Sequence, residues 1–333
     1  MIRRIFIILA VSLILGACFF ILRSNKTKER FNSDTQEFRG LSLSRQVDYL
    51  DKASKTMSVL ELRNFIKAAY PDEPPGEHAL AHKFGELVIR KEGIDGFGFC
   101  DTLLQFGCFH GAALAAVRVK GDDPNLASEL WEACKKNTKY PGSCLHGLGH
   151  AIMVIKQYDL LAAYGECKRI LNGQEAFWCE DGVSMENISR SMATSELEPY
   201  GKAGNIYYPC DSVPKEFEAP CARNHVGYLQ RQRGMDFKQT LSYCKSFSLQ
   251  KTVEECINVV GSLTEKEFFD NTESIVDQCR SAGKYNQFCI EGAVIAYSMS
   301  RQFDRAKTLC NTFHEESTKR ECHMKIESFF SLN

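Results

Sequence analysis

The chain of 333 residues lacks several features that would assign it to a common class of protein. It has no excess of one charge, because 41 lysines and arginines balance 42 aspartates and glutamates for a net charge of −1. A nucleic-acid-binding domain carries a basic patch or stripe, and no block of like charges follows the first 30 residues. We therefore expect no nucleic-acid partner.

Three short motifs are also missing. No CxxC occurs, which removes the close cysteine spacing of thiolate metal sites and redox motifs. No CxxCH is present for covalent haem attachment. The HALAH of 78–82 and the HGLGH of 146–150 are not HExxH, because alanine or glycine follows the first histidine. We infer no peptidase activity of the zincin kind.

The N-terminus is the most apolar part of the chain. Residues 5–22 are 18 uncharged residues that follow two arginines. Such a run is just long enough to cross a bilayer, which predicts an uncleaved signal anchor or transmembrane helix over 1–22. Leu15-Gly-Ala-Cys18 resembles a bacterial lipobox, so a cleaved lipoprotein signal with a lipid on Cys18 is the alternative. Either anchor makes the membrane a partner, and 23–42 is expected to be a polar linker.

The other 14 cysteines fall into a rhythm. Consecutive ones are alternately 8 to 12 and 21 to 31 residues apart, and the close pairs begin at intervals of 34, 33, 43, 34, 35 and 31. A period near 34 is typical of a repeat array. The expected disulfides join neighbours in the sequence: Cys100–Cys108, Cys134–Cys144, Cys167–Cys179, Cys210–Cys221, Cys244–Cys256, Cys279–Cys289 and Cys310–Cys322.

Each repeat is expected to be a pair of antiparallel helices. An aspartate and an amphipathic run precede the first cysteine, as at Asp159, Asp236 and Asp304, where the aspartate would cap the first helix. Small and apolar residues at helical spacing follow the second cysteine. The facing ends of two such helices lie close enough for a disulfide. Disulfides persist in oxidising compartments, so residues 23–333 are expected to be periplasmic or extracellular.

The domain order follows from these patterns. Residues 97–333 are expected to form an all-α solenoid of seven helix pairs, each with one disulfide. The preceding part, 43–96, is expected to be a helical cap. Its helices are placed near 43–54, 58–70 and 78–91, and Ser58 would cap the second of them.

An alanine-containing helix that ends in cysteine, a short turn and a second cysteine-led helix resemble the Sel1-like, TPR-related repeats of secreted cysteine-rich bacterial proteins. The alanines stand at 133, 163 and 306, and the resemblance covers about 97–333. It implies a protein or peptide ligand, since Sel1-like families mostly bind such partners. The chain departs from these families in its uneven intervals and in an insertion at 195–209.

Five of the eight histidines lie between residues 78 and 150. Two pairs are four residues apart, which puts both rings of a pair on one helical face, the spacing by which a helix offers two imidazoles to one metal ion. His110 and His146 each follow the second cysteine of their repeat by two residues, so stacked repeats should bring them together. This ladder position, expected to line a groove, continues as Asp181, Arg223, Asn258 and Glu291.

Carboxylates are expected to complete a metal site. Glu86 would extend the face of the first histidine pair, and Glu186 lies one turn beyond Asp181. Glu86 and Glu186 are the candidate catalytic, proton-transfer groups. Nitrogen and oxygen ligands suit Zn, Fe, Cu or Mn, and Met153 and Met185 would favour copper if they point inward. The expected metal ligands are His78, His82, His110, His146, His150, Asp181 and Glu186.

Two functions remain open at this point. One is a membrane-anchored, extracytoplasmic repeat protein whose histidines hold a transition metal for Lewis-acid or redox chemistry. The other is a non-catalytic scaffold in which the insertion, with Tyr200, Tyr207 and Tyr208, binds a protein or peptide and the histidines form a polar network. The histidine motifs over 78–187 resemble an uncharacterised set of secreted bacterial proteins, which attaches no reaction to them. The remaining histidines, His225, His314 and His323, are expected at the surface or capped.

Overall fold

The structure is a computed structural model that describes residues 34–71, 77–121, 123–136, 139–193, 200–202, 204–268 and 270–331. Over these ranges the chain is mainly α-helical, with one isolated bridge between Lys202 and Asn205 and no strand. The predicted all-α fold is therefore confirmed. No helix within the described ranges is long and apolar enough to cross a bilayer. The predicted anchor over 1–22 and Cys18 lie outside these ranges.

The chain divides into two compact units, Met1–Pro71 and Asp72–Asn333. The first contains α2 (Leu43–Ala53) and α3 (Val59–Ala69), close to the predicted bounds. Ser58 caps α3 as expected, and its hydroxyl accepts the backbone N–H three residues later in a reciprocal capping box.

The end of the predicted linker belongs to the fold. Residues 34–39 are helical, although 23–42 was expected to be a polar linker. Phe38 is fully buried and packs edge-on against Phe65 with ring centroids 5.1 Å apart. The sequence pattern missed this turn because only one large apolar side chain anchors it.

The second unit holds all seven predicted disulfides, with Cα–Cα distances of 5.3 to 5.8 Å. Its α-helices are α4 (His78–Glu92), α5 (Gly107–Lys120), α6 (Leu126–Lys136), α7 (Pro141–Ile155), α8 (Leu160–Ile170), α9 (Gly173–Ala193), α10 (Glu218–Arg233), α11 (Phe237–Lys245), α12 (Gln250–Glu267), α13 (Thr272–Arg280), α14 (Asn286–Met299), α15 (Phe303–Cys310) and α16 (Glu316–Ser331).

Five repeats are helix pairs and two are not, which corrects the expectation of seven. The disulfides join α6 to α7, α8 to α9, α11 to α12, α13 to α14 and α15 to α16. In the first repeat, the 3-10 helix η2 (Ile94–Phe99), which contains two glycines, replaces the first α-helix. In the fourth, turns and bends over 206–213 replace it, since Pro209 cannot continue a helix.

The aspartate caps are correct in two of three places. Asp159 and Asp236 accept the backbone N–H three residues later and begin α8 and α11. In α15 the N-cap is Gln302, and Asp304 lies in the first turn. A carboxylate there still interacts favourably with the helix dipole.

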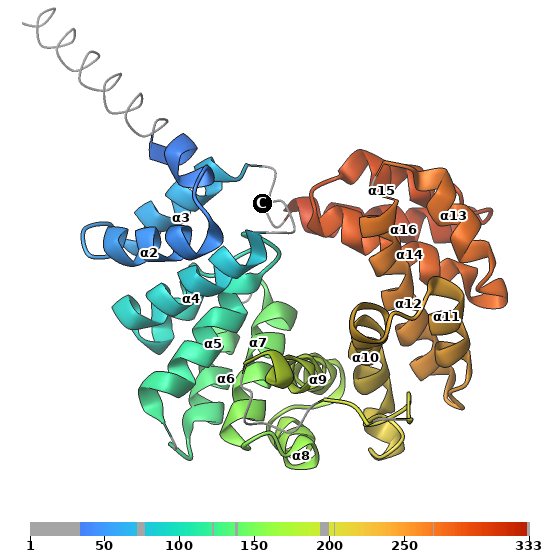
Figure 1. The fold of residues 1–333 in the computed structure, drawn as a ribbon, viewed down its shortest axis with the longest axis horizontal. Coiled ribbons are helices and arrows are strands. Elements are labelled where there is room, and N and C mark those ends of the chain that lie inside the picture. The colour runs from blue at the N-terminus through green and yellow to red at the C-terminus, as the bar shows by residue number, and fades with distance from the viewer. Residues whose placement is uncertain are drawn as a thin grey trace, which may run out of the picture. The chain divides into compact units, whose positions relative to one another are not determined.

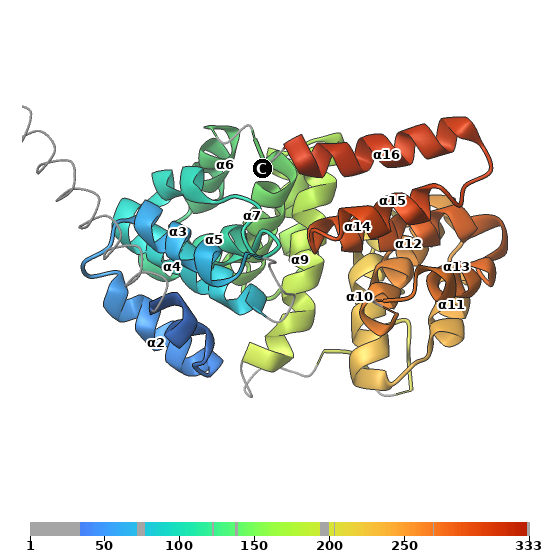
Figure 2. The same cartoon turned by 90° about the horizontal axis from the view of Figure 1, so that it is seen from above.

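The second helices of the repeats pack side by side. In Figures 1 and 2, α4, α5, α7, α9, α10, α12 and α14 follow one another, each against the next. Glycines allow this close approach: a Cβ at Gly182 in α9 would lie 1.9 Å from the carbonyl oxygen of His146, and one at Gly149 in α7 would lie 2.0 Å from that of Cys179. Gly261 and Gly292 form the same reciprocal pair between α12 and α14.

Replacing Gly292 by alanine is expected to destabilise the second unit by about 3 kcal/mol, because the Cβ would lie 1.7 Å from the backbone oxygen of Asn258 and two helices must separate. The matched control is Gly165→Ala at an exposed position of α8, where a Cβ meets nothing within 4 Å. The control should stabilise by about 0.5–1 kcal/mol. Urea unfolding of both variants measures the difference. Equal midpoints would show that the helices are not packed backbone to backbone.

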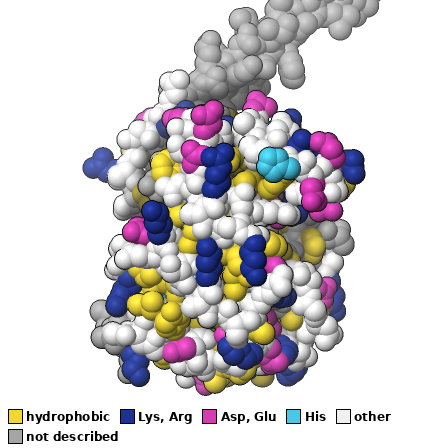
Figure 3. Space-filling view, turned by 90° about the vertical axis from the view of Figure 1, so that its right-hand side faces the viewer, with side chains coloured by type: hydrophobic (Ala, Val, Ile, Leu, Met, Phe, Trp, Pro, Cys, Tyr) yellow, Lys and Arg dark blue, Asp and Glu magenta, His cyan; other side chains and the backbone are white. Residues whose placement is uncertain are grey.

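The face of the molecule in Figure 3 carries lysine and arginine side chains interspersed with acidic and apolar ones. No single sign of charge covers that face. This agrees with the balanced composition of the chain.

Candidate metal centre

Three packed helices bring the five N-terminal histidines into one cluster. Gly111, which follows His110, faces the carbonyl oxygen of His82, where a Cβ would lie 1.9 Å away, so α4 and α5 touch. The histidines form two groups in which ligand atoms lie within 4.8 Å of one another. We call them the outer triad (His78, His82 and His110) and the inner triad (His110, His146 and His150).

The inner triad is buried, and α9 supplies two carboxylates behind it. The Nδ1–H of His146 donates to Asp181 Oδ2 at 2.9 Å, and the Nδ1–H of His150 donates to Glu186 Oε2 at 2.8 Å. Tyr158 donates its hydroxyl to the other oxygen of Glu186 at 3.0 Å. A carboxylate on Nδ1 fixes the tautomer of a ligating histidine and leaves Nε2 for a metal ion.

Each triad contains two histidine nitrogens that lie close to each other. His146 Nε2 and His150 Nε2 are 3.2 Å apart, and His82 Nε2 is 3.3 Å from His110 Nδ1. Two nitrogens bound to one tetrahedral ion at about 2.0–2.1 Å lie about 3.3 Å apart. Both separations therefore fit a shared metal ion.

Burial favours the neutral form of three of the imidazoles, those of His82, His110 and His150. It lowers the pKa of His110 well below 6.5, and neighbouring histidines lower it further. Burial, then His78 and His150, lower the pKa of His82 to about 3. Burial also lowers the pKa of His150, although the bond to Glu186 opposes the shift. Neutral imidazole is the form that binds metal ions.

Asp181 links the cluster to the rest of the ladder. Burial acts to raise its pKa, but Arg223, His146 and Asn224 outweigh burial and hold that pKa at about 2. Arg223 Nε lies 3.1 Å from Asp181 Oδ1 and its Nη1 lies 2.9 Å from Glu255 Oε2. The predicted ladder is therefore continuous from His146 through Asp181 to Arg223, and it then turns to Glu255.

The last two ladder positions make other contacts. Asn258 donates its side-chain amide to the backbone oxygen of Phe288, and Glu291 accepts from Gln287 and Lys325. The ladder is thus a polar seam between packed helices at its N-terminal end.

The structure places the predicted carboxylates away from ligand positions. Asp181 and Glu186 belong to neither triad and serve as acceptors for histidine N–H groups. Glu86 pairs with Lys83 at 3.0 Å, Arg90 at 3.5 Å and Arg118 at 3.6 Å, so its carboxylate is not joined to the histidines.

The two methionines differ in burial. Met153 is fully buried in the core, and Met185 is 36% exposed. The condition under which they would favour copper is not met for Met185.

Removing either carboxylate is expected to weaken metal binding without removing a ligand. Asp181→Asn and Glu186→Gln should each lower affinity for Zn²⁺ 10- to 100-fold, because an amide holds the Nδ1–H less strongly. Competition with a chromophoric chelator measures this. Glu255→Gln, which touches only Arg223 in this network, is the control and should change affinity less than threefold.

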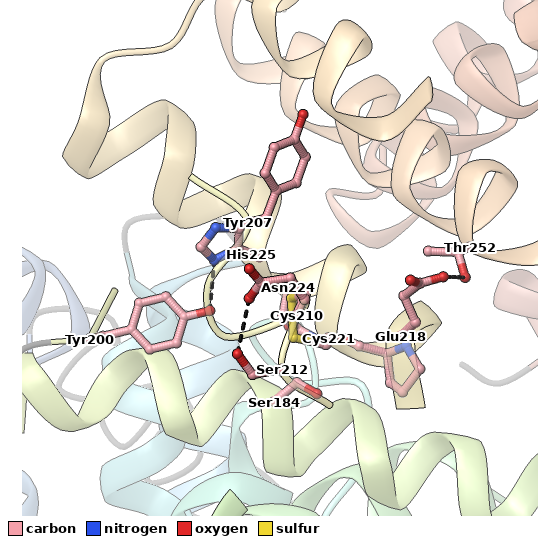
Figure 4. The surroundings of a disulfide bond; sticks show 12 residues. Ser184, Tyr200, Tyr207, Cys210, Ser212, Glu218, Cys221, Asn224, His225 and Thr252 are labelled. Atoms are coloured by element: carbon pink, nitrogen blue, oxygen red, sulfur yellow. Dashed lines mark hydrogen bonds between the residues drawn. A yellow bond between two sulfur atoms is a disulfide. The ribbon is translucent and has the colours of Figure 1, made fainter. Parts of the chain in front are cut away.

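The burial of His225 differs from the expectation from the sequence. It was expected at the surface or capped, but it is 1% exposed. Tyr200 donates its hydroxyl to His225 Nδ1 at 2.7 Å, and His225 Nε2–H donates to the backbone oxygen of Ile206 at 2.8 Å. Figure 4 shows Tyr200 and His225 pointing toward each other beside the Cys210–Cys221 disulfide. Tyr200 thus anchors the inserted segment to α10.

Because His225 is buried and neutral, it should make the fold sensitive to acid. Burial lowers its folded pKa from 6.5 to about 4, while Ile206 opposes the shift. The unfolded chain then binds the extra proton first, so stability is full above pH 6.5 and falls as pH drops toward 4. The expected contribution is about 3 kcal/mol over this window. His225→Gln should flatten the pH dependence of unfolding by that amount relative to wild type. Parallel curves would contradict a buried neutral His225.

No family model matches the chain, and neither a curated protein nor a solved structure matches it. The resemblance to Sel1-like repeats therefore stays a prediction. The assignment of a function depends on the geometry of the histidines.

Proposed function

We propose that the protein is an extracytoplasmic metal-binding protein whose inner triad holds a transition-metal ion, with Zn²⁺, Fe²⁺ or Cu²⁺ as the candidate ions. One observation carries the proposal: the two Nε2 atoms of His146 and His150 lie 3.2 Å apart while both Nδ1 atoms are held by carboxylates. A neutral imidazole that donates from Nδ1 presents a lone pair on Nε2, so two lone pairs face each other.

A polar network without a metal explains this pair poorly. A proton between the two nitrogens would require one doubly protonated ring, and burial lowers the pKa of His150. Unpaired facing acceptors in a buried site cost free energy. A cation at the shared position removes the conflict, and the three nitrogens with two supporting carboxylates match the ligands that Zn, Fe and Cu prefer.

The triad would leave one coordination position for chemistry, because three protein ligands leave the fourth position of a tetrahedral ion free. An ion there would act as a Lewis acid, and an iron or copper ion could change its oxidation state. The chain's own part is to fix the ligand tautomers through Asp181 and Glu186 and to exclude bulk water from a buried centre.

The test is metal binding by the full chain with its disulfides intact. Dialysed protein should retain at least one equivalent of Zn²⁺, measured by mass spectrometry of the elements. His146→Ala with His150→Ala should lower the affinity at least 100-fold. The matched control, His314→Ala with His323→Ala, removes two histidines outside the cluster and should bind as wild type. Less than half an equivalent in wild type, or equal binding by the two double variants, removes the proposal.

The location outside the cytoplasm is part of the proposal and has its own support. Seven disulfides are typical of an oxidising compartment. The uncharged run over 5–22 supports tethering to a membrane, either by that run or by a lipid on Cys18. Cys18→Ser should release the protein from membranes only if the lipid is the anchor. Recovery of wild type in the soluble fraction with its first 22 residues intact would contradict both anchors.

The scaffold that binds a protein or peptide through its insertion has less support. Tyr200 is 4% exposed and held by His225, while Tyr207 stacks on Tyr243 with ring centroids 5.4 Å apart. These two tyrosines are part of the packing of α10 and α11. They are therefore not free to adapt to a partner.

A further inference from the structure

We propose that the cluster holds two metal ions and that His110 is a ligand of both. The inference rests on the proposed function, since the first ion is the one in the inner triad and the second is added in the outer triad. It gives the centre a dinuclear form in which one imidazole joins the two sites.

The distances between the histidine rings fit two metal sites that share one ligand. In the outer triad the ring centroids are 4.8, 5.5 and 5.1 Å apart. In the inner triad they are 4.9, 4.6 and 5.0 Å apart. Rings bound to one tetrahedral ion have centroids about 5 Å apart. The contacts therefore form two triangles that meet at His110.

The two nitrogens of His110 can serve different triads. Its Nδ1 lies 3.3 Å from His82 Nε2, so this nitrogen faces the outer triad. The other nitrogen, Nε2, is left for the inner triad, where the His110 ring stacks on that of His150 at 4.6 Å. Among the residues that the structure describes, no acidic side chain is bonded to His110, in contrast to His146 and His150, whose Nδ1 atoms bond to carboxylates. To bind metal through both nitrogens, the neutral His110 ring must lose its remaining N–H proton and become an imidazolate. Binding of the second ion would release this proton to solvent.

A strained turn supports the outer triad. Leu104, Gln105 and Phe106 have φ angles of 47°, 61° and 63°, three consecutive left-handed residues that are not glycine. Each such residue costs about 1–2 kcal/mol. The turn directs the backbone oxygen of Leu104 to His78 Nδ1 at 2.7 Å and so helps to fix the orientation of this ring in the outer triad. The Cys100–Cys108 disulfide closes the segment that contains the turn.

The two sites differ in access. All three inner histidines are buried, whereas His78 and His82 are partly exposed. An outer ion with three nitrogen ligands would keep an open position that water or a small anion can reach. The outer site is thus the one at which an exogenous ligand would bind, and the inner ion would be shielded.

Copper loading of the full oxidised chain tests the proposal. Wild type should bind two Cu²⁺ per chain after desalting. Two Cu²⁺ ions joined by one imidazolate are magnetically coupled, so the integrated electron paramagnetic resonance intensity should be well below two spins. This wild-type measurement needs no variant to fold. His78→Ala with His82→Ala should bind one Cu²⁺ and give one full spin.

Each result of this experiment tests one part of the proposal. One copper in wild type, unchanged in the His78 and His82 double variant, would overturn the second site and leave the inner site standing. Two coppers with two full spins would overturn the sharing of His110. No copper at all would remove the proposed function itself. His314→Ala with His323→Ala is the control and should keep two coupled ions.

Discussion

Reduction of the seven disulfides is expected to unfold the second unit. Each bond closes a loop of 8 to 12 residues, and the chain-entropy model gives about 3 kcal/mol for such a loop. Together the seven amount to about 20 kcal/mol, which exceeds the roughly 5–15 kcal/mol by which folded domains are stable. Loss of helical circular dichroism at 25 °C under a strong reductant, with alkylation of the 14 cysteines that form these bonds, is the expected result.

A single repeat provides the control for this prediction. Cys310→Ala with Cys322→Ala removes only the last bond, which joins α15 to α16. The variant should stay folded and lose about 3 kcal/mol of stability. A reduced and alkylated wild type that keeps its melting temperature would show that helix packing alone holds the repeats.

Metal binding is expected to raise the free energy of unfolding by at least as much as one disulfide does. The inner triad takes ligands from α5 and α7, and its carboxylates come from α9, so unfolding disperses the site. Free Zn²⁺ at 1,000 times its dissociation constant should add about 4 kcal/mol to the free energy of unfolding. This corresponds to a rise in melting temperature of about 8 °C.

The stabilisation should depend on the inner triad. His146→Ala with His150→Ala should show a smaller rise in melting temperature with Zn²⁺, because only the outer triad remains to bind an ion, whereas His314→Ala with His323→Ala should show the full rise. Calorimetry in the presence of a chelator gives the metal-free reference. An equal rise in both double variants would place the ion elsewhere in the chain.

Much of this fold is visible in the sequence because a covalent constraint repeats in it. The spacing of 14 cysteines predicts each disulfide correctly, since a bond between facing helix ends spans few residues. What spacing cannot show is whether the segment before the first cysteine is an α-helix. In the first and fourth repeats, glycine and proline decide against it, and in the fourth His225 holds an irregular segment in place by bonds to Tyr200 and Ile206.

The sequence also predicts the cluster of histidines, but it does not predict the roles of the carboxylates around it. Helical spacing and repeat register place His110 beside His146, with ring centroids 4.9 Å apart. The role of Asp181 and Glu186 depends on which nitrogen of each histidine faces them, and sequence spacing holds no information on ring orientation. Glu86 illustrates the same limit, because its position on α4 did not reveal three competing basic partners.

X-ray absorption at the metal K edge of the Zn-loaded protein tests the central claim most directly. The account predicts a first shell of imidazole nitrogens at about 2.0–2.1 Å with no sulfur, since the cysteines of the described repeats are in disulfides. His146→Ala with His150→Ala should remove imidazole scattering from the inner ion. A shell with sulfur at about 2.3 Å, or one of oxygen alone, would contradict a buried histidine metal centre.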